Sequence, residues 1–339
     1  MVEKSGFYLD SVEGCNQDAT NRVTCLMERA RVDYDPSANG TIDEITTSIV
    51  ALEGKEALAR KINFAQCYGV PLSYALYCDE RENVYFFHFH SLTEVEFVKH
   101  YRSYPEFADW IAAIKGWKSS KPFRERQDLP YFDKALRKAG TPWPTNIDCF
   151  ICDESNRPLA ILEFQNAKTT KVAQHCNNDF FLCKMATKDE KGRVKYHDDI
   201  RRWTSQEILR VQSGLRYFIL TWAPAEDDYM LKEVDTITIP YFPYKEGKPN
   251  WDYMNAYKAG MHRYVTSGKL VANEGAIAAN FQTYNLIKKQ GRIDSVVHEP
   301  PLSYGDKTFP SLYYCRKELV QNDQASLVQR FIDLLTAGR

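Results

Sequence analysis

The chain has 339 residues, of which 44% are hydrophobic and 26% are charged, and its formal net charge at pH 7 is −1. This composition is ordinary for a soluble globular protein, and the length allows one large domain or two of moderate size. The balanced charge gives no argument for a polyanionic partner, so any surface that binds nucleic acid must be a local patch.

Cysteine usage and hydropathy bear on the cell compartment. The nine cysteines are scattered and several lie in apolar runs, which favours reduced, buried thiols over a secreted disulfide framework. Cys149 and Cys152 form a C-x-x-C pair, but a structural zinc ion needs four ligands and the sequence has no second such pair, so we interpret them as buried thiols. The N-terminus lacks the apolar core of a signal peptide, and no run approaches the roughly 20 apolar residues of a membrane span. We therefore expect a cytoplasmic protein with no membrane partner.

The first part of the chain is expected to form an irregular arm, a helix and two strands. Residues 1–40 are the N-terminal arm, which ends in the turn-rich stretch DYDPSANG. Thr41 and Glu44 have the spacing of a capping box, and apolar residues then recur at helical intervals to about Tyr68. Strands are predicted at 70–78 and 84–90.

The remaining elements predict an α/β fold. Residues 91–142 are expected to form a helical insertion, because LTEVEFVKHY and PEFADWIAAIKGW are amphipathic. Two strands joined by the polar turn DESNR follow near 147–152 and 158–166. A well-formed helix (DDIRRWTSQEILRVQSG) and the strands LRYFILTWA and DTITIPYF come next. The order predicts an α/β core over residues 41–250 and a mainly helical C-terminal region over 251–339.

Three polar groups lie close together in the predicted strand pair. Because side chains alternate along a strand, Glu163 and Gln165 share one face. The turn at DESNR brings Asp148 of the first strand across from Glu163. Burying two carboxylates without a counter-charge is costly, and a divalent cation between them removes this cost. Hard oxygen ligands suit Mg²⁺. The alternative is a solvent-facing edge hairpin, which Ile161 disfavours because it shares the face of Glu163.

The arrangement of Asp148, fourteen intervening residues and then Glu163-Phe164-Gln165 resembles the D-x(n)-E-x-K signature of the PD-(D/E)XK nuclease superfamily, whose best-known members are restriction endonucleases. The order of predicted elements between about 41 and 225 is also similar to that core. Two positions depart from the signature: Ile147 replaces the usual proline, and Gln165 replaces the usual lysine. The resemblance implies a restriction-endonuclease-like fold, in which a mixed central sheet is flanked by helices.

The resemblance also implies a Mg²⁺-dependent DNA endonuclease, with Mn²⁺ as a substitute, and a sequence-specific type II restriction enzyme in particular. Asp148, Glu163 and the backbone carbonyl of Phe164 would hold the metal, which lowers the pKa of a bound water. Gln165 can orient that water only through hydrogen bonds. An acid from the first helix commonly completes such a site, and the candidates Glu53 and Glu56 are not separated by periodicity. Double-strand cutting with one site per chain implies a homodimer on double-stranded DNA.

Basic residues supply candidate nucleic-acid contacts. The densest basic segment interleaves charge with Trp117 and Phe123, which suits phosphate contact with some stacking, although a solvated surface loop is equally compatible. Two further lysines follow the second strand closely. The candidates are Lys118, Lys121, Arg124, Lys168 and Lys171.

Other functions stay open at this stage. His88 and His90 share a strand face and are metal-ligand candidates, but a polar strand face is favoured because a third ligand is not evident. Gln165 favours a nuclease-like DNA-binding module that has lost catalysis. A third possibility is a nuclease for repair, recombination or RNA processing.

Overall fold

The computed structural model describes most of the chain before residue 239 and five stretches after it. The described residues are 6–17, 22–36, 41–115, 118, 129–141, 145–167, 171–172, 185–188, 190, 192, 194–197, 200–238, 244–245, 248–249, 303–304, 307–308 and 311–337. The chain divides into two compact units: Met1–Glu163 with Ile208–Arg216, and Phe164–Glu207 with Tyr217–Arg339. The fold is α/β with a large mixed sheet, as the sequence predicts.

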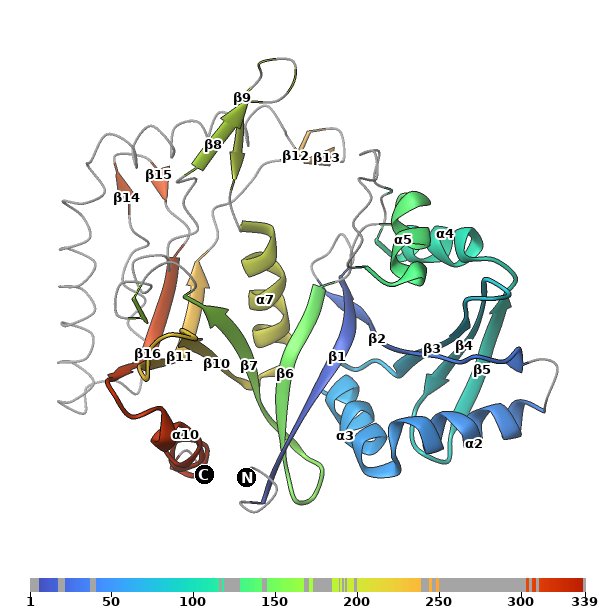
Figure 1. Cartoon of the computed structure of the whole chain (residues 1–339), viewed down its shortest axis with the longest axis horizontal. Helices are drawn as coiled ribbons and strands as arrows, with labels where there is room; N and C mark the ends of the chain where they lie inside the picture. The colour runs from blue at the N-terminus through green and yellow to red at the C-terminus, as the bar shows by residue number, and fades with distance from the viewer. Residues whose placement is uncertain are drawn as a thin grey trace. The chain divides into compact units, whose positions relative to one another are not determined.

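In the first unit the strand order is β7-β6-β1-β2-β3-β4-β5 (Figure 1). Strands β2 and β3 pair in parallel, and the other neighbouring pairs are antiparallel. Parallel neighbours need a crossover connection, which is provided here by two helices between β2 and β3. In chain order the strands are β1 (Phe7–Gln17), β2 (Val23–Arg31), β3 (Leu72–Cys78), β4 (Asn83–Phe89), β5 (Val95–Tyr101), β6 (Thr145–Asp153) and β7 (Pro158–Asn166).

The two crossover helices, α2 (Ile42–Glu53) and α3 (Lys55–Gln66), are separated by one glycine. The predicted capping box is present: the Thr41 hydroxyl accepts a hydrogen bond from the backbone N–H of Glu44, and the Glu44 carboxylate accepts one from the backbone N–H of Thr41. Gly54, at φ +84°, ends α2 and begins α3. The single helix expected from 42 to 68 is therefore two helices, because this backbone conformation is open mainly to glycine.

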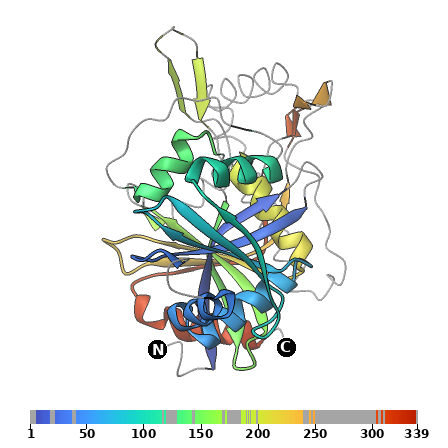
Figure 2. The same ribbon diagram turned by 90° about the vertical axis from the view of Figure 1, so that its right-hand side faces the viewer.

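Helices cover both faces of the sheet of the first unit. In Figure 2, α2 and α3 lie on one face, and α4 (Tyr104–Lys115) and α5 (Tyr131–Lys138) lie on the other. Aromatic side chains fill the layer under α4 and α5; the Tyr77 and Phe132 rings stack with centroids 4.1 Å apart, and Phe86 is fully buried.

In the second unit, β16 (Ser311–Val320), β11 (Tyr229–Thr238) and β10 (Arg216–Trp222) are antiparallel neighbours, and the end of β7 follows β10 in the strand order. Helix α10 (Leu327–Thr336) follows a short 3₁₀ turn, η3 (Gln324–Ser326), and its Phe331 ring meets the Phe218 ring edge-on. The further elements are α7 (Ile200–Ser213), which spans the division, and the hairpins β8–β9 (Met185–Lys188, Val194–His197), β12–β13 (Tyr244–Lys245, Lys248–Pro249) and β14–β15 (Ser303–Tyr304, Lys307–Thr308).

Three of the predicted segments contain strands that the sequence did not predict. The arm at 1–40 contains β1 and β2, which lie in the middle of the sheet. Within the insertion at 91–142, the stretch 95–101 is strand β5 and not a helix. It is an edge strand with exposed residues from Glu96 to Lys99, so the alternation of buried and exposed residues that is typical of a strand is absent. In the C-terminal region, 311–320 is strand β16 and 327–336 is a helix. Most of the predicted region, residues 251–302, lies outside the described residues, as do several predicted loop positions.

Candidate active site on strands β6 and β7

The hairpin of β6 and β7 sets the relation between the first two motif residues. Its register pairs Cys149 with Leu162 and Phe150 with Ile161. Asp148 and Glu163 are the next residues beyond the Cys149–Leu162 pair on their two strands. Residues directly opposite each other in an antiparallel pair have Cβ atoms roughly 4.5–5.5 Å apart and point to the same face of the sheet. The strand pairing therefore holds Cys149 opposite Leu162 and brings Asp148 and Glu163 next to that pair.

The turn of this hairpin is held by its own polar groups. The Asp153 carboxylate accepts hydrogen bonds from the backbone N–H groups of Ser155 and Arg157, both at 3.0 Å. Asn156 has φ +59°, a conformation that asparagine tolerates in turns. This local chemistry explains why the predicted turn at DESNR is the observed one. The register of the hairpin then shifts between Ile151 and Cys152, before the strands reach Asp148 and Glu163.

Strand β6 has a β-bulge at Asp148. On β1, Asp10 pairs with Phe150 and Val12 pairs with Ile147. Ser11 therefore faces both Asp148 and Cys149, which is the two-against-one pattern of a bulge. Bulges re-aim a side chain and are frequent beside active sites.

The two carboxylates differ in exposure. The side chain of Asp148 is exposed, whereas Glu163 is only 2% exposed. A carboxylate as deeply buried as Glu163 needs compensation by hydrogen bonds, a positive charge or a cation. The pair thus combines one exposed carboxylate with one that is almost fully buried.

Gln165 follows Glu163 by two residues on β7 and belongs to the second unit. Its side-chain oxygen accepts hydrogen bonds from the Thr221 hydroxyl at 3.1 Å and from the Lys232 ammonium at 3.3 Å. Lys232 lies on β11, opposite Ile219 of β10, and is fully buried. Sequence reasoning missed Lys232; the only signal is a single lysine in the apolar start of the strand, YMLKEV.

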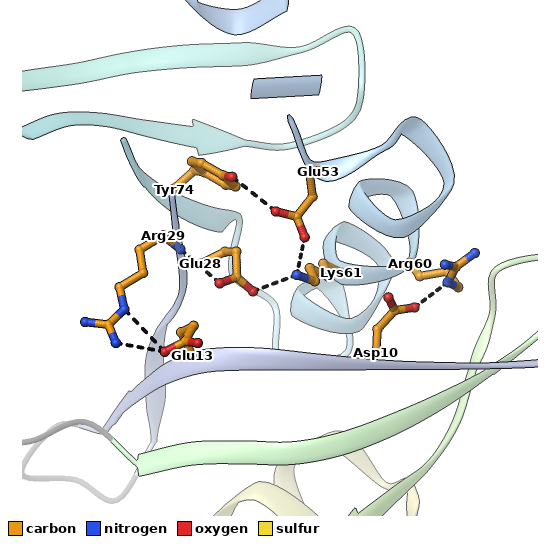
Figure 3. Close-up of polar contacts among 8 residues, drawn as sticks. All are labelled: Asp10, Glu13, Glu28, Arg29, Glu53, Arg60, Lys61 and Tyr74. Carbon is orange, nitrogen blue, oxygen red and sulfur yellow. Dashed lines mark hydrogen bonds and ion pairs between the residues drawn. The ribbon is translucent and has the colours of Figure 1, made fainter. Parts of the chain in front are cut away.

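The two acids proposed from the first helix have separate partners, and Figure 3 draws those of Glu53. Glu53 binds the Lys61 ammonium and accepts a hydrogen bond from the Tyr74 hydroxyl at 3.1 Å. Lys61 also lies 2.8 Å from Glu28 of β2. Glu56 accepts a hydrogen bond from the Asn156 side-chain amide at 2.9 Å. Glu53 thus takes part in a buried network of the first unit, while Glu56 contacts the turn of the β6–β7 hairpin.

Burial and charge oppose each other within this network. Burial raises the pKa of Glu28, and the neighbouring Lys61 opposes that shift. Burial alone would lower the pKa of Lys61, but Glu28 and Glu53 raise it by more, so Lys61 is held in its charged form. The pKa of Tyr74 is raised by burial and by Glu53, which keeps its hydroxyl protonated and able to donate.

Metal binding at the motif would rest on few side chains. Within the ranges that the structure describes, no group of three His, Cys, Asp or Glu side chains is arranged to hold a metal ion. A cation at Asp148 and Glu163 would therefore be held by two carboxylates together with backbone oxygen and water. This donor set fits Mg²⁺, which usually retains several waters and binds one or two carboxylates.

The candidate nucleic-acid contacts are only partly within the described residues. Lys118 lies 2.6 Å from Asp109, and both side chains are more than half exposed. Lys171 is exposed. The other candidates, Lys121, Arg124 and Lys168, lie outside the described residues, as do Trp117 and Phe123.

The weaker metal candidates have other contacts. His88 and His90 both approach the Glu96 carboxylate, at 3.7 Å and 3.6 Å. Burial lowers the pKa of His88 despite this neighbour. Cys149 and Cys152 are buried free thiols, as predicted, and burial raises the pKa of Cys149 to about 12.

Comparison with known proteins gives no relative from which a function can be transferred. No family model matches the chain, and neither the curated proteins nor the solved structures include a significant match. None of the helices in the described part of the chain is both long and apolar enough to cross a membrane. A function can therefore be inferred only from the residues of β6, β7 and their neighbours.

Proposed function

We propose that the chain is a Mg²⁺-dependent nuclease that hydrolyses phosphodiester bonds of double-stranded DNA. The observation that carries the proposal is the β6–β7 pairing of Cys149 with Leu162, which has Asp148 and Glu163 as its next neighbours on the two strands. Gln165 lies two residues beyond Glu163 on β7. The bulge at Asp148 and the burial of Glu163 also support a specialised site over a plain hairpin.

In this proposal Asp148, Glu163 and the backbone carbonyl of Phe164 hold the ion. When bound, Mg²⁺ supplies a Lewis acid that lowers the pKa of water and offsets negative charge on the phosphate. A water oxygen bonds to phosphorus as one ester P–O bond breaks, and the leaving oxygen takes up a proton. The products are one phosphomonoester end and one hydroxyl end. Gln165 helps to hold the reacting groups through hydrogen bonds.

Sequence-specific cutting by a homodimer is the form of this activity that we favour. A nuclease that cuts both strands with one site per chain needs two chains. Digests of plasmid and phage DNA with Mg²⁺ and with EDTA test the activity and its specificity together. Discrete fragments that form only with Mg²⁺ are expected. Cleavage of single strands or RNA in preference to the duplex would instead favour a repair or RNA-processing nuclease.

A second candidate function is a DNA-binding module without catalysis. The observation that favours it is Gln165 in place of a lysine on the motif strand. Mg²⁺ binding by calorimetry without cleavage of any nucleic acid would support this function. Cleavage that is abolished by Asp148→Asn would exclude it.

A further inference from the structure

We infer that Lys232 is a positioning residue that turns Gln165 so that its amide N–H groups, and not its oxygen, face the reacting phosphate or water. The inference rests on the proposed nuclease function and assigns a role to a residue outside the motif. It is built from contacts within the second unit: Gln165 on β7, Thr221 on β10 and Lys232 on β11.

The partners of Gln165 decide the orientation of its amide. An ammonium group can only donate hydrogen bonds, so the Gln165 atom 3.3 Å from the Lys232 ammonium must be the oxygen. The Thr221 hydroxyl donates to the same oxygen at 3.1 Å. An amide oxygen has two lone pairs, and these two donors use both of them. Further interactions of Gln165 are then made through its NH₂ group.

This orientation gives Gln165 the hydrogen-bonding character of the lysine it replaces. A lysine at this position would offer N–H donors to an anionic oxygen. A glutamine whose oxygen is already bound also offers N–H donors, without the charge. Gln165 therefore cannot accept a proton from water, and its role is to orient an oxygen of water or phosphate.

Lys232 is distinguished from the neighbouring lysine on β16 by its burial. Its side chain is fully buried, and its ammonium lies 5.8 Å from the centre of the Tyr314 ring. Lys317, directly opposite on β16, lies 5.2 Å from the same ring but is only half-buried. Burying an ammonium group is costly. Lys232 is nevertheless buried, and it contacts Gln165 from a strand two positions away in the sheet. This makes Lys232 a candidate functional residue. Lys317 is a matched control for Lys232, because the two lysines are paired across β11 and β16 and both lie near the Tyr314 ring.

The test is single-turnover cleavage of phage DNA by the full chain at saturating Mg²⁺. We expect Lys232→Met to slow cleavage about 10- to 100-fold, because a small misplacement of a positioned group has effects of this size. Lys317→Met is expected to change the rate less than about threefold, as for a substitution away from the site. Calorimetry should show the same Mg²⁺ affinity for both variants and the wild type.

A rescue experiment separates positioning from a purely structural role. Gln165→Lys alone places two ammonium groups together and should slow cleavage. The double variant Gln165→Lys with Lys232→Met removes the repulsion, keeps an N–H donor at position 165 and should cleave faster than either single variant. A merely structural role for Lys232 predicts no such recovery.

Gln165→Glu keeps the test decisive if Lys232→Met does not fold. The carboxylate can still bind Lys232, but it has no N–H to donate, so cleavage should be lost while the fold is retained. The inference about Lys232 would be overturned, but not the proposed nuclease, by wild-type rates in Lys232→Met or in Gln165→Glu. Failure of the double variant to recover activity would have the same meaning. An inert wild-type protein would overturn the proposed nuclease together with the inference.

Discussion

The Lys61 ammonium lies 2.8 Å from a carboxylate oxygen of Glu28, and both side chains are buried. Lys61 also binds Glu53 at the end of α2 (Figure 3). One lysine on α3 therefore joins a strand in the middle of the sheet to the break between two helices. This network explains how charged residues are accommodated in the core of the first unit.

Replacement of Lys61 by methionine should destabilise the protein strongly. The substitution leaves Glu28 and Glu53 buried without their shared counter-charge, and removing one partner of a buried ion pair costs about 3–5 kcal/mol. Urea denaturation measures this change. Lys99→Met is the control, because Lys99 and its partner Glu106 are well exposed; its effect should stay below about 1 kcal/mol. Equal stabilities of Lys61→Met and the wild type would show that the network is not a stabilising feature.

The cost of Lys61→Met should increase with pH. The pKa of Glu28 is raised above 4.5 in the folded protein, chiefly by burial, so the stability linked to it is present below pH 4.5 and is lost as pH rises through the folded value. Lys61 opposes this shift, so its removal raises the pKa further and enlarges the loss. Denaturation of both proteins from pH 4 to pH 8 should show a widening difference in unfolding free energy. A constant difference would contradict this assignment.

Gly54→Ala should destabilise the junction between α2 and α3. Gly54 has φ +84°, and a Cβ built there meets no atom within 4 Å, so the cost comes from the backbone conformation alone. Such a conformation costs a non-glycine residue about 1–3 kcal/mol. Thermal unfolding measures the loss, with the exposed neighbour Lys55→Ala as the control. A Gly54→Ala protein as stable as the Lys55→Ala protein would contradict the assignment.

The β6–β7 hairpin could be predicted from the sequence because its signals are local. Two apolar runs are separated by DESNR, and the Asp153 side chain closes the turn within a few residues. The predicted 158–166 agrees with β7, and the predicted 147–152 lies within β6. The relation of Asp148 to Glu163 does not follow from the turn alone, because the register of the hairpin shifts between Ile151 and Cys152.

Strands β1 and β2 could not be predicted because their charged residues are neutralised by distant parts of the chain. Glu28 forms an ion pair with Lys61, and Arg29 forms one with Asp133 on α5. The sequence around Glu28 and Arg29 does not show these distant partners, so their charges resemble those of an exposed segment. Lys232 illustrates the same limit at the site, since its contact with Gln165 joins residues 67 positions apart.

Glu56→Gln should leave Mg²⁺-dependent cleavage within about twofold of the wild type, as expected for an exposed substitution away from the chemistry. The Gln side-chain oxygen can still accept the hydrogen bond from Asn156 that Glu56 accepts in the wild type. Cleavage rates at several Mg²⁺ concentrations provide the measurement. A large loss of rate with an increased Mg²⁺ requirement would instead place Glu56 among the metal ligands.

Asp148→Asn provides the most direct test of the proposed nuclease. The measurement is single-turnover cleavage of duplex phage DNA by the wild type, Asp148→Asn and Glu163→Gln in Mg²⁺, with Mg²⁺ affinity and thermal unfolding recorded for each. We predict Mg²⁺-dependent cleavage by the wild type and a loss of at least about 100-fold in each variant, the scale of losing a key electrostatic group. Mg²⁺ binding should weaken in both variants while Asp148→Asn, whose side chain is exposed, stays folded. Wild-type rates in a folded Asp148→Asn protein would contradict the account.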